Sequence, residues 1–156
     1  MKRKRLFLWI ILIILPILLL GCNIKVNFNG KKSSNFYYTN LLAKDLTLET
    51  SYKCSVIDTN YYKEQLLSKE DSATIKKFTQ ALSKGSFIEK PKDLPLKPLY
   101  KLIIVFSKDK YVINVYNEKF ISVFPWDGYY SMDYIDMSKL QVSYNLFGLC
   151  KYIVNQ

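Results

Sequence analysis

The sequence lacks histidine: none of its 156 residues is one. This absence excludes Ser-His-Asp and Cys-His catalytic groups, and it excludes every metal site built on imidazole ligands. Acidic residues are missing from the first 21 positions, although the chain has 13 of them in all. Any chemistry that the protein performs must therefore use side chains other than imidazole.

The sequence also lacks an apolar run long enough to span a bilayer. Lys2-Arg3-Lys4-Arg5 precedes an apolar stretch from Leu6 to Leu20, which is 15 residues long. A transmembrane helix needs about 20 such residues, so a permanent span is the weaker interpretation. A basic start, a short apolar core and a small residue at the end are typical of an export signal. The positive charges keep the N-terminus on the cytoplasmic side.

The end of this stretch, Leu19-Leu20-Gly21-Cys22, resembles the lipobox of bacterial lipoproteins. The resemblance implies that residues 1–21 are a signal peptide, that signal peptidase II cleaves before Cys22, and that Cys22 carries a diacylglyceryl group with an acyl group on its amine. The protein would then lie on the extracytoplasmic face of the cell membrane, held by lipid. The alternatives are an ordinary secretory signal or an uncleaved helix with an incidental cysteine.

Removal of the signal changes the charge of the chain. The whole sequence has 23 basic and 13 acidic residues, net +10, and the four basic residues before Cys22 leave the mature portion at net +6. A moderately basic domain outside the cytoplasm suits anionic lipid heads, anionic wall polymers or an envelope protein as neighbours. We expect no nucleic-acid partner, because the compartment is wrong and no binding motif is recognised.

The mature chain divides into a tether and one domain. Residues 22–35 contain the lipidated cysteine and a polar spacer with Asn29-Gly30 and Lys31-Lys32-Ser33-Ser34, without sustained periodicity. This composition predicts a flexible tether. Residues 36–156 have the length of a single compact domain.

Four segments of this domain read as strands. Tyr52, Cys54 and Val56 alternate with polar residues in 51–57, and 99–106 is almost continuously apolar. Segments 111–116 and 120–124 follow after short polar turns, which join antiparallel neighbours. We expect these last three segments to form a meander.

Two segments read as helices. Ser68 can cap a helix within 67–85, and another begins near Ser143. Phe36 to Lys44 is ambiguous and compatible with a short helix, and the prolines in 87–98 predict a connection without regular structure. The fold class is therefore α+β: an antiparallel sheet of about four strands packed by two helices, preceded by a signal helix and a flexible tether.

Cys54 and Cys150 both fall on the apolar faces of their predicted elements. In an oxidising compartment two such cysteines pair more often than not, which predicts a disulfide between the last helix and the first strand. The alternative is two buried free thiols.

The segment from Phe124 to Met137 departs from a plain fold pattern, because it is rich in aromatic and acidic residues. Large rigid aromatic rings with polar edges are typical of contact surfaces. The candidate binding surface consists of Trp126, Asp127, Tyr129, Tyr130 and Tyr134. The alternative is that these rings cap the end of the sheet. The spacing of the carboxylates does not follow a calcium-binding loop, and we expect neither a metal nor a cofactor.

This aromatic and acidic stretch and the following 144–150 resemble the C-terminal half of an uncharacterised family of small lipoproteins from low-GC Gram-positive bacteria. The resemblance implies no activity. The sequence thus favours noncatalytic binding at the cell envelope. Two alternatives remain: a small cell-wall-active hydrolase that uses Asp127 or Asp133, and an immunity or inhibitor lipoprotein.

The lipid anchor gives a direct prediction. Replacing Cys22 with Ala removes the thiol that would receive the lipid, so Cys22→Ala should release the protein from membranes and abolish its labelling by a radioactive fatty acid. Fractionation and labelling measure the two effects. Labelling that persists in the variant would contradict the assignment.

Overall fold

The computed structural model describes residues 32, 34–126 and 131–156, all of which fall in one compact unit, Lys31–Gln156. Its centre is a seven-stranded, wholly antiparallel sheet in the order β2-β1-β4-β5-β6-β7-β3. The strands are β1 (Lys53–Asp58), β2 (Lys63–Leu66), β3 (Phe87–Ile88), β4 (Tyr100–Val105), β5 (Lys110–Val115), β6 (Phe120–Pro125) and β7 (Asp133–Asp136). The α+β class is confirmed.

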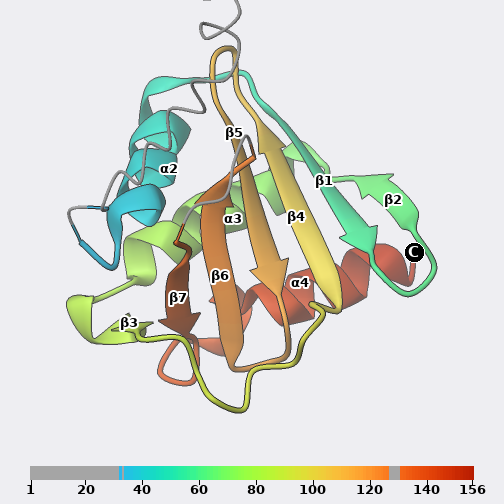
Figure 1. The fold of residues 1–156 in the computed structure, drawn as a ribbon. Helices are drawn as coiled ribbons and strands as arrows, with labels where there is room; N and C mark the ends of the chain where they lie inside the picture. The colour runs from blue at the N-terminus through green and yellow to red at the C-terminus, as the bar shows by residue number, and fades with distance from the viewer. Residues whose placement is uncertain (1–31, 33, 127–130) are drawn as a thin grey trace, which may run out of the picture. The chain divides into compact units, whose positions relative to one another are not determined.

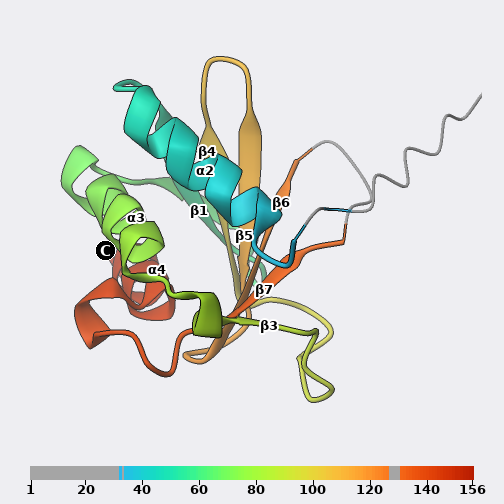
Figure 2. The same cartoon turned by 90° about the vertical axis from the view of Figure 1, so that its left-hand side faces the viewer.

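Three α-helices pack on one face of the sheet, as Figure 2 shows: α2 (Tyr37–Leu48), α3 (Lys69–Ala81) and α4 (Leu146–Val154). Short 3-10 turns, η1 (Lys84–Ser86) and η2 (Val142–Tyr144), precede β3 and α4. The main core lies between this helical layer and the sheet. Its fully buried side chains include Leu42 from α2, Phe78 from α3, Leu146 from α4 and Ile113 from β5.

The predicted meander is confirmed. β4, β5 and β6 pair in sequence at the centre of the sheet, with Ile103 opposite Val112 and Val112 opposite Phe124 (Figure 1). The predicted first strand is β1, which pairs with β4. Both predicted helices are present, and Ser68 caps α3 by accepting a hydrogen bond of 3.0 Å from the Asp71 amide.

The prediction of about four strands is wrong, because three short strands extend the sheet. β2 has charged or exposed residues along its length, as expected for an edge strand, and so shows no apolar alternation. β3 has two residues and ends before Pro91, so the expectation that 87–98 has no regular structure is also wrong at its first two positions. β7 buries Asp133 beside Ile135, and an inward carboxylate hides the strand pattern.

From Tyr37 on, the ambiguous segment from Phe36 to Lys44 falls in α2, which continues to Leu48, so the prediction of two helices is one too few. The N-terminus of α2 is capped from another element. Phe36 precedes the helix and supplies no side-chain cap. The cap comes from Asp133 in β7, whose Oδ2 accepts from the backbone N–H of Thr39 at 2.8 Å and from the Thr39 hydroxyl at 3.0 Å. A carboxylate at this position satisfies a free amide and favours the positive end of the helix dipole.

Lys32 completes the environment of Asp133. The Lys32 ammonium lies 3.1 Å from Asp133 Oδ1 and donates to the Met132 carbonyl at 2.6 Å. Lys32 falls within the predicted flexible tether, yet its side chain is fixed to the sheet. The boundaries predicted at residues 21 and 22 lie outside the described residues and remain predictions.

Loss of the Asp133 carboxylate should destabilise the fold. Asp133→Asn removes the charge facing Lys32 and one strong acceptor, so we expect the free energy of unfolding to fall by about 3 kcal/mol. Urea denaturation followed by circular dichroism measures the change. Asp136→Asn is the matched control in the same strand, because Asp136 is partly exposed and its 3.8 Å ion pair with Lys119 is weak. Equal losses in the two variants would contradict the special role of Asp133.

Candidate functional site

Trp126 follows β6 directly and is 54% exposed. Its backbone N–H donates to the Lys110 carbonyl at 2.9 Å, which continues the β5–β6 ladder by one residue beyond the Tyr111–Pro125 pair. The Lys110 ammonium lies 3.7 Å from the centroid of the Trp126 ring. A cation over an indole face is a favourable arrangement, and the ring stays partly exposed to solvent.

Trp126 belongs to a row of side chains that crosses four neighbouring strands. Lys53 in β1 pairs with Val105 in β4, Val105 pairs with Lys110 in β5, and Lys110 is followed by Trp126. We call these four residues the Lys–Trp row. Since Cys54 and its alternate neighbours face the helices, the row lies on the opposite face of the sheet, where none of the described helices packs.

A small depression of about 210 Å³ lies beside Trp126. It is formed where the first half of α2 meets the β4–β5 hairpin and the end of β6. Its lining residues are Tyr38, Leu41, Lys108, Asp109, Lys110, Tyr111, Pro125 and Trp126. The depression combines aromatic walls with two lysines and one carboxylate, Asp109, so its lining carries one net positive charge. This combination suits an anionic group carried on an apolar or sugar-like frame.

Tyr111 fixes the hairpin against α2. Its hydroxyl donates to Asp45 Oδ2 at 2.7 Å, and its side chain is 4% exposed. Burial first, and the bond to Asp45 second, raise the pKa of Tyr111 well above its usual value. The hydroxyl therefore stays protonated and serves as a structural donor.

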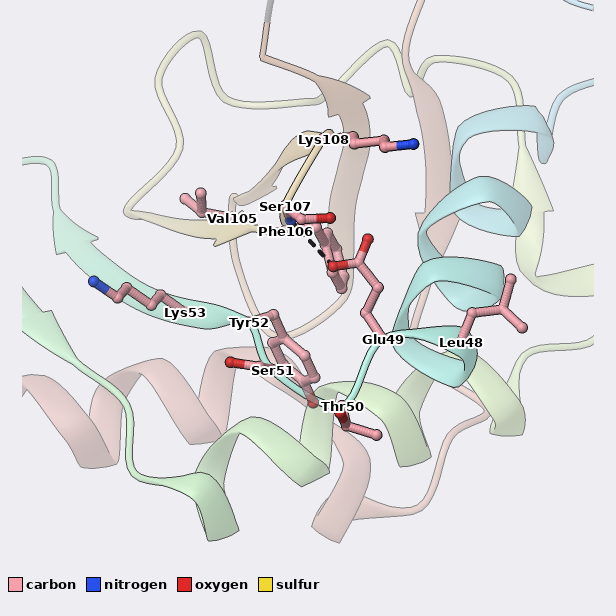
Figure 3. A pocket seen from close by; sticks show the side chains of 10 residues that line it. All are labelled: Leu48, Glu49, Thr50, Ser51, Tyr52, Lys53, Val105, Phe106, Ser107 and Lys108. Atoms are coloured by element: carbon pink, nitrogen blue, oxygen red, sulfur yellow. Dashed lines mark hydrogen bonds between the residues drawn. The ribbon is translucent and has the colours of Figure 1, made fainter.

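A larger, open depression of about 810 Å³ lies at the same end of the sheet, between the C-terminus of α2, the start of β1 and the β4–β5 hairpin. Figure 3 shows the rings of Tyr52 and Phe106 at its centre, and their centroids are 5.2 Å apart. Glu49 Oε2 accepts from the Ser107 amide at 3.1 Å and so joins α2 to the hairpin. Lys53 extends away from α2, while Lys108 extends toward it.

The structure separates the predicted binding residues. Trp126 lies at the end of the sheet that carries the β4–β5 hairpin, whereas Tyr134 lies within β7, between Ser122 of β6 and Ile88 of β3. Tyr134 is half-buried, and burial raises its pKa. Asp127, Tyr129 and Tyr130 lie outside the described residues.

Asp133, the candidate hydrolase residue, is 0% exposed, and both its oxygens accept from Lys32 or Thr39. Burial raises the pKa of this carboxyl, although the partners oppose that effect. Its environment is that of a structural carboxylate rather than of an acid or base open to a substrate. Among the described residues, no group of three or more potential metal-ligating side chains occurs.

The lysines of the row were missed in the sequence. Lys53 and Lys110 are far apart along the chain and belong to no motif. The signal that could have found Lys110 is the short turn at Asn117-Glu118, since the register that it sets places Trp126 opposite residue 110. Lys53 could not be placed without knowing that β1 pairs with β4.

Cys54 and Cys150 are free thiols, and both are buried. The predicted disulfide is not found, and the alternative of two buried thiols describes the structure. Burial raises the pKa of the Cys54 thiol to about 11, and it raises the pKa of Cys150 further. Both side chains act as small apolar groups in the core.

Residues 32–150 match the family model described as a domain of unknown function, DUF4883. The chain belongs to this family. The chain is also similar to the crystal structure of a protein from Clostridium perfringens that is provisionally named a lipoprotein. The TM-score is 0.73 and the sequence identity is 32%, and the match covers 80% of this chain and 99% of that one. No curated protein matches the sequence.

These comparisons agree with the resemblance to uncharacterised lipoproteins, and they assign the DUF4883 domain no activity. Within the part of the chain that the structure describes, no helix is both long and apolar enough to pass through a membrane. The lipobox itself lies before the matched region.

The buried thiols give a prediction for chemical labelling. At pH 8 a thiol with a pKa of about 11 is ionised in roughly one molecule in a thousand, so native Cys54 should resist iodoacetamide. We expect no labelling of Cys54 or Cys150 in the native protein and labelling of both in denaturant without a reductant, measured by mass spectrometry. Denatured protein that reacts only after reduction would show a disulfide instead.

Proposed function

We propose that this DUF4883 protein is a lipoprotein anchored through Cys22 on the extracytoplasmic face of the cell membrane, and that its domain binds an anionic component of the envelope without catalysis. The sequence Leu19-Leu20-Gly21-Cys22 supports the anchor. The name of the similar Clostridium perfringens protein supports the same placement. The net charge of +6 after Cys22 supports an anionic partner.

The observation that carries the proposal is the pairing of Lys110 with the exposed ring of Trp126. Folding normally buries tryptophan, so a half-exposed indole over a lysine at the rim of a depression is typical of a contact residue. The lysine can meet a phosphate or carboxylate while the ring face covers an apolar or sugar surface. Anionic wall polymers and lipid headgroups both offer this combination.

The hydrolase alternative finds less support. Asp133 is buried and engaged by Lys32 and Thr39, so a substrate could reach it only if the N-terminus of α2 moved. Asp127 lies outside the described residues. With Asp133 engaged in the fold, the pair of free carboxylates that glycoside hydrolysis ordinarily uses lacks one of its two candidate members.

An immunity or inhibitor role is the second candidate, and the β2 edge favours it. β2 lies at one end of the sheet order, and the hairpin before it exposes Tyr61 and Tyr62 at 82% and 80%. Leu66 at the end of β2 is 76% exposed. An extended peptide could add to such an edge through backbone hydrogen bonds.

Trp126 fluorescence tests the proposed function, because Trp126 is the only tryptophan after Cys22. The processed lipoprotein, kept in neutral detergent micelles, is titrated with poly(glycerol phosphate) and separately with added phosphatidylglycerol. We expect a change in emission with at least one of these anions, reversed by salt because the contact is electrostatic. No response to either anion would contradict the proposal.

Isothermal titration calorimetry of a charge variant measures how much the Lys–Trp row contributes to binding of the anion. Lys110→Gln should weaken binding of the responding anion by about fivefold, the effect of one lysine near a dense anionic surface. Lys63→Gln is the control, since Lys63 is exposed on the edge strand β2, away from Trp126. Equal weakening by both variants would indicate a nonspecific charge effect and remove the row from the proposed site.

A further inference from the structure

At the hairpin end of the sheet, the positive charges of the strands lie on the face away from the helices. The strands β1, β4, β5 and β6 are described in full, and on the face away from the helices their charged residues are Lys53, Lys101 and Lys110. Asp58 is the single carboxylate in these four strands. Because side chains alternate along a strand, Asp58 points to the same side as Cys54 and Val56, which is the helical side. Glu64 in β2 and Asp136 in β7 share the face away from the helices, but they pair with Ile57 and Phe120 at the other end of the strands. The hairpin end of the face, which carries the Lys–Trp row, is therefore basic.

The acidic residues near the hairpin belong to the helical side. Glu49 follows α2 and accepts from Ser107, and Asp45 within α2 accepts from Tyr111. Asp109 lines the small depression together with α2, Lys110 and Trp126, and it is flanked in the sequence by Lys108 and Lys110. An anionic surface that approaches the Lys–Trp row from the side away from the helices meets Lys53 and Lys110 before the carboxylates of Asp45 and Glu49.

The row alternates cations with apolar groups. Lys53 is exposed, Val105 is 39% exposed, Lys110 is half-buried and Trp126 is 54% exposed. Neighbouring strands are about 4.8 Å apart, so the four side chains span roughly 14 Å. Tryptophan and lysine side by side are typical of the membrane interface, where the indole lies at headgroup depth and the ammonium reaches the phosphates.

Lys32, where the chain enters the domain, is held on the helical face of the sheet, a few strand residues from the Lys–Trp row on the other face. Lys32 is bound to Asp133, which pairs with Val123, and Val123 is three residues from Trp126 in β6. Three strand residues measure about 10 Å. Lys32 is ten positions after Cys22, and even a fully extended chain over ten steps spans at most about 36 Å.

We propose that the Lys–Trp row docks on the anionic phospholipid headgroups of the leaflet that holds the Cys22 anchor. The proposal rests on the proposed function and names its partner as the membrane surface rather than a wall polymer. The short tether decides between the two, because it keeps the row within reach of the leaflet and makes docking intramolecular. A tethered site of this kind needs little intrinsic affinity, since its effective concentration is on the order of millimolar.

The test uses the processed lipoprotein reconstituted in vesicles of phosphatidylcholine, with or without phosphatidylglycerol. Lipids brominated near the headgroup end of the acyl chain quench an indole at that depth. We expect Trp126 to be quenched and its emission shifted to the blue in vesicles that contain phosphatidylglycerol, and to resemble the detergent sample in phosphatidylcholine alone. Equal quenching in both kinds of vesicle would overturn charge-driven docking.

Lys53→Gln is the sharper variant, because Lys110 touches the reporter ring and its removal would alter the emission by itself. Lys53→Gln should lower the ratio of docked to undocked molecules about fivefold. Lys63→Gln carries the same charge change on the helical side of the sheet and should leave the quenching unchanged. An equal loss in both variants would overturn the assignment of the row as the docking surface.

The outcomes also separate this proposal from the proposed function. If poly(glycerol phosphate) changes the Trp126 emission while phosphatidylglycerol vesicles cause no quenching, the site binds a wall polymer and the membrane docking is wrong. If neither probe has an effect, both proposals fail.

Discussion

The buried carboxylate of Asp133 joins three parts of the chain that lie far apart in the sequence. It is part of β7, it caps α2 through Thr39, and it pairs with Lys32 where the chain enters the domain. A carboxylate removed from water is costly unless every oxygen has a partner. The cost is offset only when the helix, the strand and the entering segment are all in place, so the interaction makes their assembly cooperative. It also explains why α2 begins where it does without a capping residue of its own.

The same interaction limits what the sequence could reveal. The central meander and the helices α3 and α4 were predictable, because each depends on periodicity, a cap or a turn within one segment. α2 was ambiguous because its cap comes from residue 133, and β7 was missed because that inward residue is charged. β2 was missed for the opposite reason: as an edge strand it needs no buried face. In each case the deciding partner is distant in the sequence.

The candidate site likewise combines a feature visible in one segment with features that depend on residues distant in the sequence. Trp126 stood out as the single tryptophan after Cys22, since composition alone reveals it. The lysines that give the site its charge did not stand out, because the pairing of β1 with β4 and of β5 with β6 brings them together. Tyr134 was grouped with Trp126 by proximity in the sequence, but the turn of the chain between β6 and β7 places it in the interior of the sheet.

The link between Lys32 and β7 has a mechanical consequence for a protein held at its N-terminus. A pull on the chain before Lys32 acts first on the ion pair with Asp133 and then on a strand that has neighbours on both sides. Force that enters there is shared by the β6–β7 and β3–β7 ladders instead of peeling an edge strand from the sheet. If the chain is anchored at Cys22 as we propose, this attachment would spread a pull from the anchor over two ladders of the sheet.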